Sequence, residues 1–163
     1  MSRAERLQQL QRLCDYSFKR PALLEEALTH DSNRVNNREV PTYQRLEFLG
    51  DSVLSLVVSE YLYRNNTNFN EGELTKKRSE LTDAKKQTQI LEKLALKDYI
   101  LFGQSVPKDQ FKGHHKFVES LIGAVYIDGG LEEARKLIRK FWEFTDGANT
   151  ASTASDGSYC VLS

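Results

Sequence analysis

Apolar side chains recur at every third or fourth position over most of this chain, which is the spacing of one face of an α-helix. In the run QRLEFLGDSVLSLVV, residues 44–58, they cover more than a narrow stripe, so we expect this helix to be central to the domain. The alternation of apolar and polar residues that is typical of strands is nearly absent. The sequence therefore predicts an all-α fold.

Further segments with helical spacing lie on both sides of this run. They cover residues 4–13, 21–30, 74–96, 114–130 and 131–144. Polar stretches separate them, and Gly129 and Gly130 stand where glycines usually end a helix. A chain of 163 residues suits one domain, which we assign to residues 1–144. The small polar residues 145–163 are typical of a flexible tail.

The overall charge does not indicate a nucleic-acid partner, because Lys plus Arg and Asp plus Glu are equal at 23 each. Any such partner must be met by a local basic patch. No apolar run approaches the length of a membrane span, and the N-terminus lacks the apolar stretch of a signal peptide. We therefore expect an intracellular protein, cytoplasmic or nuclear. Its two cysteines, Cys14 and Cys160, are too few for a disulfide scaffold and lack the spacing of a metal site.

Two carboxylates, Glu47 and Asp51, stand four residues apart and would share one face of the central helix. On an arbitrary helix such a pair is most often a solvated acidic edge. Gly50, however, suggests that another element packs closely here, and Glu119 lies inside an apolar run where an unpaired carboxylate is costly to bury. Together with Glu71, acids converging from separate helices could bind Mg²⁺ and cleave a phosphodiester.

These residues lie in segments that resemble the ribonuclease III endonucleases. RLEFLGDSVL, residues 45–54, resembles the signature of that family. Three further pieces match in the same order: ALTHDS (27–32), NEGELTKKRSELT (70–82) and VESLIGAVYIDGG (118–130). The resemblance extends from about Tyr16 to Phe144, and a decamer with three ordered satellites is hard to produce by chance.

The resemblance implies an all-helical endonuclease domain that acts as a homodimer on double-stranded RNA. Its products would carry 5′-phosphate and 3′-hydroxyl ends with short 3′ overhangs. Glu47, Asp51 and Glu119 match the metal-binding acids of the family, which would hold Mg²⁺, with Mn²⁺ as an alternative. Asp51 and Glu119 are thus also catalytic candidates, Glu71 matches a glutamate with a supporting catalytic role, and Phe48 matches a residue near the subunit boundary.

Two positions depart from the family pattern. Gln44 replaces a residue that is usually acidic, which is a mild loss. Lys116 replaces an aspartate metal ligand, and an ammonium group pointing inward would lower metal affinity sharply. Lys116 could instead form an ion pair with Glu119, three residues later. Alternatively, a few residues are missing here relative to the family, and His114 or His115 approaches the vacant position, where histidine would suit Mn²⁺ better than Mg²⁺.

RNA contact requires positive charge, and the segment of residues 74–96 contains two basic clusters. They are Lys76, Lys77 and Arg78, and then Lys85 and Lys86. The alternative is a solvated helix face balanced by Glu73, Glu80 and Asp83. The residues after 144 do not resemble the double-stranded-RNA-binding domain that often follows this catalytic domain. We therefore expect weak binding with steep salt dependence and weak sequence preference.

The final residues, 160–163, read Cys-Val-Leu-Ser and fit a box for farnesylation of Cys160, although an accidental cysteine is the plain alternative. One lipid would give only reversible membrane association. Three functions therefore remain open. They are an active metal-dependent endoribonuclease, a binding or scaffold protein disabled by Lys116, and an unrelated helical adaptor that uses the tail for membranes.

Overall fold

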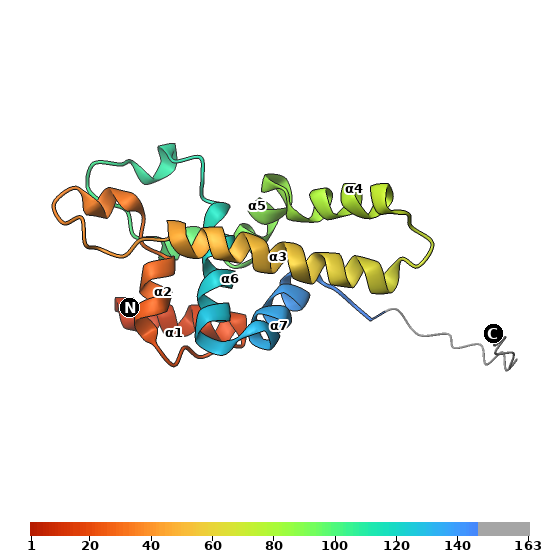
Figure 1. Cartoon of the computed structure of the whole chain (residues 1–163). Helices are drawn as coiled ribbons and strands as arrows, with labels where there is room; N and C mark the ends of the chain where they lie inside the picture. Colours follow the sequence, from red (N-terminus) through yellow and green to blue (C-terminus); the bar gives the residue numbers. More distant parts are fainter. Residues whose placement is uncertain (147–163) are drawn as a thin grey trace, which may run out of the picture.

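The part of the chain that the structure describes, residues 1–146 of a computed structural model, is a bundle of α-helices (Figure 1). The helices are α1 (Arg3–Cys14), α2 (Pro21–Ala27), α3 (Gln44–Asn65), α4 (Glu71–Thr82), α5 (Ala84–Lys93), α6 (Lys116–Gly129) and α7 (Leu131–Trp142). Short 3-10 turns occupy Asp31–Arg34, Leu96–Tyr99 and Lys108–Gln110. No β-strand occurs within residues 1–146, so the prediction of an all-α fold is confirmed.

The helical spacing over residues 74–96 belongs to two helices, α4 and α5, with a break between them. Asn70 and Glu73 form a capping box that begins α4. Asp83 ends α4 because its backbone is extended, and its carboxylate accepts a hydrogen bond from the backbone N–H of Lys86 at 2.7 Å, which caps α5. The break allows α4 to lie along α3 while α5 contacts α6.

The central helix is α3, as its apolar pattern predicted, and its most extensive contact is with α6. In Figure 1, α4 and α5 lie on one side of α3, and α1, α2 and α7 lie on the other. Leu54 and Val58 of α3 and Phe117 and Ile122 of α6 are almost completely buried in one hydrophobic core. The burial of these apolar side chains positions the start of α6 against the first half of α3.

Two glycines allow α3 and α6 to approach closely. A Cβ atom added to Gly50 would lie 1.7 Å from the backbone carbonyl oxygen of Glu119, and one added to Gly123 would lie 2.2 Å from that of Leu46. The prediction that Gly50 marks close packing is confirmed. This contact sets the acidic turn of α6 beside the acidic turn of α3.

Replacing Gly50 by alanine is expected to lower the free energy of unfolding by at least about 2 kcal/mol, because the new methyl group meets the rigid backbone of α6. Gly72→Ala is the matched control. A Cβ atom there would lie 3.4 Å from the Asn70 side chain, so the better helix propensity of alanine should leave stability unchanged or slightly raised. Urea unfolding of both variants measures the difference. Equal stabilities would contradict the close packing of α3 and α6.

No helix within residues 1–146 has the length and apolar character needed to cross a bilayer. Most of the predicted tail, residues 147–163, lies outside the described residues. Cys160 is among them, so its farnesylation stays a prediction, which mass spectrometry of natively expressed protein would test.

Candidate functional site

Three acidic side chains lie where α3 crosses the N-terminal end of α6. Glu47 is in the first turn of α3, Asp51 follows one turn later, and Glu119 is in the first turn of α6. Asp51 is exposed and Glu47 is partly exposed, whereas Glu119 is buried with 9% of its surface accessible. The site therefore has an open side formed by α3 and an enclosed side formed by α6.

Glu119 is held by a hydrogen bond from a neighbouring helix. Nε2 of Gln87, on α5, donates to Oε1 of Glu119 at 2.7 Å. Burial, opposed by this hydrogen bond and reinforced by the negative charges of Asp51 and Glu47, raises the pKa of Glu119 to about 7. At neutral pH this carboxyl group is therefore divided between its protonated and charged forms, and a cation nearby would favour the charged form.

Lys116 is the first residue of α6, and its ammonium group points to the acids. Its Nζ atom lies 3.6 Å from Oε1 of Glu47, so the ion pair is formed with α3 and the alternative pairing with Glu119 is wrong. The pKa of Glu47 is raised overall. Burial is the main cause and the charges of Asp31 and Asp51 add to it, whereas Lys116 lowers the pKa. Because the Lys116 side chain is 48% exposed, it can leave this position without losing a buried environment.

The sequence predicted that the three carboxyl groups would converge on one point. In the structure they do not. Within residues 1–146 no three Asp, Glu, His or Cys side chains are arranged to hold a metal ion. Glu47 is drawn to Lys116, and carboxylates with no cation between them repel each other. The negative charge of Asp51 helps to raise the pKa of Glu119, so these two carboxyl groups lie near each other. These oxygen donors fit a hard divalent cation, which would relieve their repulsion.

The histidine alternative for the vacant ligand position is not supported. The ring of His114 packs against those of Phe102 and Phe111, at centroid distances of 5.6 and 5.1 Å. His114 and His115 line a separate cavity of about 520 Å³ next to the C-terminal part of α5, and none of the three acids lines it. Burial lowers the pKa of both histidines.

Glu71 is not brought to the other acids within one chain. It is the first residue of α4, and its carboxylate accepts a hydrogen bond from Oγ1 of Thr75 at 3.0 Å. It lines a groove with Tyr63, near the opposite end of α3 from the acidic turn. A catalytic role for Glu71 therefore stays a prediction that one copy of this fold does not support.

The basic clusters predicted to bind RNA lie on the helices beside the site. All five side chains are at least partly exposed: Lys76, Lys77 and Arg78 on α4, and Lys85 and Lys86 on α5. Lys77 pairs with Glu80 at 3.3 Å, as the balanced-face alternative predicted, and Arg78 bonds to Ser59 at 3.1 Å. Lys85 and Lys86 lie in the first turn of α5, the helix from which Gln87 contacts Glu119, so this positive charge is on a helix next to the acidic site.

The site contains two polar residues that the sequence analysis missed. Gln87 contacts Glu119, and Asp31 lies near enough to Glu47 for its charge to raise the Glu47 pKa. The available signal for Gln87 was its position three residues before Ile90, on the apolar face of its helix. Asp31 stood inside a matching segment, ALTHDS, in which no role had been assigned to it.

The pKa of Glu119 predicts how stability depends on pH in the absence of divalent cations. Its pKa is about 7 in the folded protein against an ordinary value of 4.5, so folding is favoured by protonation. Its contribution is complete below pH 4.5 and is lost as the pH rises through 7. Comparison with Glu119→Gln isolates it from the histidines, whose lowered pKa values act in the opposite direction.

We expect the free energy of unfolding of the parent, relative to Glu119→Gln, to fall by about 2 kcal/mol between pH 5 and pH 8. Urea unfolding in EDTA measures it. A difference that stays constant across this range would show that the Glu119 pKa is not raised.

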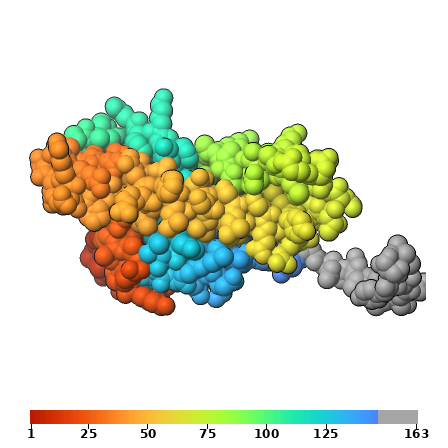
Figure 2. All heavy atoms as spheres, viewed as in Figure 1, coloured from red at the N-terminus to blue at the C-terminus, as the bar shows by residue number. Residues whose placement is uncertain are grey.

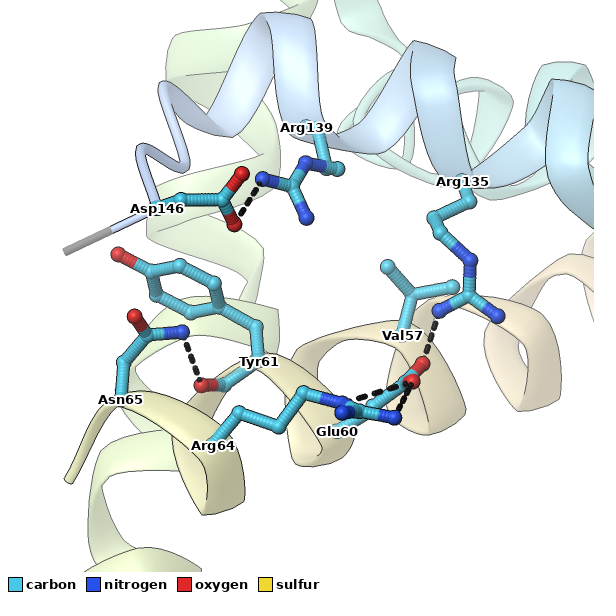
Figure 3. A pocket seen from close by; sticks show the side chains of 8 residues that line it. All are labelled: Val57, Glu60, Tyr61, Arg64, Asn65, Arg135, Arg139 and Asp146. Carbon is cyan, nitrogen blue, oxygen red and sulfur yellow. Dashed lines mark hydrogen bonds and ion pairs between the residues drawn. The ribbon is translucent and has the colours of Figure 1, made fainter. Parts of the chain in front are cut away.

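A cavity lies between α7 and the C-terminal half of α3, away from the acidic site. Ion-paired side chains line it (Figure 3). It measures about 500 Å³. Arg135 and Arg64 both pair with Glu60, and Arg139 pairs with Asp146 at 2.6 Å. Because each guanidinium group already has a carboxylate partner, this cluster joins α7 to α3 and offers no uncompensated charge to a ligand.

Comparison with known proteins agrees with the helical fold. A family model described as ribonuclease-III-like matches residues 20–143. Ribonuclease 3 of Rickettsia rickettsii is 41% identical over 144 residues, which is 85% of this chain and 63% of that protein. Ribonuclease 3 of Sinorhizobium fredii is 41% identical over 157 residues, or 93% of this chain and 63% of its own length.

Solved structures of ribonuclease III and of Dicer are also similar to this chain. The nuclease domain of ribonuclease III from Campylobacter jejuni superimposes with a TM-score of 0.75 at 35% identity, covering 82% of this chain and 94% of that domain. Dicer from Pichia stipitis matches with a TM-score of 0.58 at 31% identity, covering 77% of this chain and 55% of that one.

The described fold and its paired acids define a helical domain of the nuclease-domain class. The chain belongs to the ribonuclease-III-like family. The predicted family membership is thereby confirmed, and an unrelated helical adaptor is excluded. The chain spans 63% of the length of these curated relatives.

Proposed function

We propose that this chain is a divalent-metal-dependent endoribonuclease that cleaves double-stranded RNA. The observation that carries the proposal is the presence of Glu47, Asp51 and Glu119 at the junction of α3 and α6, where the close contact at Gly50 sets the acidic turns of the two helices side by side. Membership of the ribonuclease-III-like family supports it. The bound metal, Mg²⁺ or Mn²⁺, would activate water and stabilise the leaving oxygen.

The roles of the protein residues follow from their positions. Asp51 and Glu119 would hold the cation, and Glu47 would join them when Lys116 moves away. The exposure of Asp51 leaves the cation accessible to a phosphate group, while Glu119 forms the enclosed wall of the site. The basic side chains of α4 and α5 would contact RNA phosphates, which makes binding weak at high salt.

The test of this function uses the purified full chain, a long double-stranded RNA and Mg²⁺. We expect discrete shorter products with 5′-phosphate and 3′-hydroxyl ends, and no cleavage in EDTA. Single-stranded RNA of the same sequence serves as the control substrate and should remain intact. Full-length double-stranded RNA after prolonged incubation with Mg²⁺ or Mn²⁺ would exclude the enzymatic function.

A second function is favoured by the ion pair between Lys116 and Glu47. If Lys116 keeps Glu47 from the cation, the chain would bind double-stranded RNA without cutting it and would act as a scaffold in RNA processing. Retention of labelled double-stranded RNA in a filter-binding assay, together with the absence of products, distinguishes this function from the first.

We further propose that the chain forms a homodimer through α3. This helix is exposed along the face shown in Figure 2, between the α4–α5 layer and the α6–α7 layer. Phe48 and Ile127 expose 80% and 43% of their surfaces, and both line one apolar groove with Leu23 and Leu49. The related Campylobacter nuclease domain is described as having a region involved in dimer formation, which supports the proposal.

Phe48→Glu is expected to weaken dimerisation at least about 30-fold, because the charge would replace an aromatic anchor at the interface. Val35→Glu is the matched control, since Val35 exposes 72% of its surface in a loop outside α3. Sedimentation equilibrium measures both dissociation constants. Equal dimerisation of the two variants would place the interface elsewhere.

A further inference from the structure

We infer that Gln87 is a positioning residue for the proposed metal-binding carboxylate of Glu119. This inference rests on the proposed function and adds a residue for which the family resemblance assigned no role. Gln87 lies on α5, whereas the acids that match the family lie on α3 and α6. The site would therefore draw on a third helix.

The amide of Gln87 is fixed in place by two hydrogen bonds. Its Nε2 atom donates to Oε1 of Glu119 at 2.7 Å and to the backbone carbonyl oxygen of Thr82 at 2.9 Å. The residue exposes only 4% of its surface. Because an amide nitrogen has two hydrogens, both are used, and the side chain has one orientation in which it can serve both acceptors.

The remaining oxygen of the amide is left without compensation. Oε1 of Gln87 is buried and has no hydrogen-bond partner within residues 1–146. A leucine of similar size would fill this position without burying an unpaired acceptor, so packing alone does not explain a glutamine here. The contacts that distinguish glutamine from leucine are the two donated hydrogen bonds, and of these the bond to Glu119 is the one that reaches the acidic site.

This hydrogen bond has a direct consequence for the site. The donated N–H stabilises the charged form of the Glu119 carboxylate, which is the form that binds a cation. It also engages Oε1, so that Oε2 is the oxygen left for a cation shared with Asp51. Since Lys116 engages Glu47, the carboxylate of Glu119 matters more here than in a site with all its acids free.

The test is the binding of Mn²⁺ to the purified full chain, measured by isothermal titration calorimetry at pH 7.5 without RNA. We expect Gln87→Leu to bind Mn²⁺ at least about tenfold more weakly than the parent, as is typical when a residue that orients a metal ligand is removed. Gln89→Leu makes the same change at an exposed position of α5 and should bind like the parent.

Thermal melting in EDTA separates positioning from a structural role. Gln87→Leu should melt within about 3 °C of the parent, because it also removes the unpaired Oε1 atom. If it fails to fold, Gln87→Met, which also lacks the donor, takes its place. At saturating Mn²⁺ the KM for double-stranded RNA should be unchanged, because Gln87 is enclosed between helices.

The possible outcomes separate the role of Gln87 from the proposed function. Unchanged Mn²⁺ affinity in Gln87→Leu, with a parent that binds Mn²⁺ and cleaves RNA, would overturn the role of Gln87 and leave the proposed function intact. A loss of affinity in proportion to a loss of melting temperature would also overturn it, since the effect would then be structural. A parent that neither binds Mn²⁺ nor cleaves RNA would overturn both.

Discussion

Asp51→Asn is expected to lower the rate of double-stranded RNA cleavage more than about 100-fold. Changing a residue that merely orients a metal ligand typically costs 10- to 100-fold, so loss of a ligand itself should cost at least the upper end of that range. Asparagine keeps the size of the side chain and one oxygen but removes the negative charge that would face the cation together with Glu119. The cleavage rate at saturating RNA, in Mg²⁺ and in Mn²⁺, measures the effect.

Asp109→Asn provides the control for this change. It removes one negative charge from an exposed 3-10 turn and should leave the cleavage rate within about twofold of the parent, because surface substitutions outside a site have small effects. Binding of uncleaved RNA should persist in Asp51→Asn, since the basic side chains of α4 and α5 are unchanged. Undiminished cleavage by Asp51→Asn would show that the junction of α3 and α6 is not the active site.

The elements of the fold that the sequence predicted well are those in which one local pattern determines the outcome. The apolar side chains of residues 44–58 cover much of the helix circumference, and a helix of that kind packs against several others, as α3 does. Gly50 was informative because glycine destabilises a helix interior, so its presence there indicates a close contact. That contact is with the backbone of α6.

The break at Asp83 was not predicted because the apolar spacing continues across it. The helical period over residues 74–96 describes which side chains face the core, and both α4 and α5 keep that face inward. What ends α4 is the backbone of Asp83, whose carboxylate caps the next helix. A capping residue within a periodic segment allows a helix to end without requiring it to do so.

The site was predictable in its residues and less so in its contacts. Glu47 and Asp51 share a face by helical geometry alone, and Glu119 was notable as a carboxylate inside an apolar run. The partner of Lys116 depended on the packing of α6 against α3, which the spacing of residues within α6 does not determine. Gln87 was missed for the same reason, because its contact with Glu119 joins two helices that are separate in the sequence.

Lys116 decides between the two functions that the chain can have. As the first residue of α6, it places a positive charge at a helix N-terminus, where the helix dipole disfavours it. Its pairing with Glu47 offsets this cost, and the half-exposed side chain competes with a cation for that carboxylate. The competition should be weak at high Mg²⁺ concentrations, since ion pairs with this exposure contribute about 1 kcal/mol or less.

Lys116→Asp is therefore expected to raise the affinity for Mg²⁺ by at least about tenfold and to increase cleavage at low Mg²⁺ concentrations. The substitution releases Glu47, adds a carboxylate beside it, and replaces repulsion of the cation by attraction. Two unit charges 4 Å apart interact by about 4 kcal/mol at an effective dielectric constant near 20, and solvent around this exposed side chain leaves about 1–2 kcal/mol of that. Aspartate also suits the first turn of a helix, so the variant should fold.

The matched control is Lys112→Asp, which makes the same change of charge at an exposed position in the loop before α6. Titrating Mg²⁺ into both variants by calorimetry, and measuring cleavage over the same concentrations, separates a local effect from a general one. If the parent cleaves RNA and Lys116→Asp shifts the curve to lower Mg²⁺, Lys116 acts by competing for Glu47. Cleavage by Lys116→Asp alone would identify the parent as a binding protein, while identical curves for the two variants would show that the ammonium group does not affect the cation.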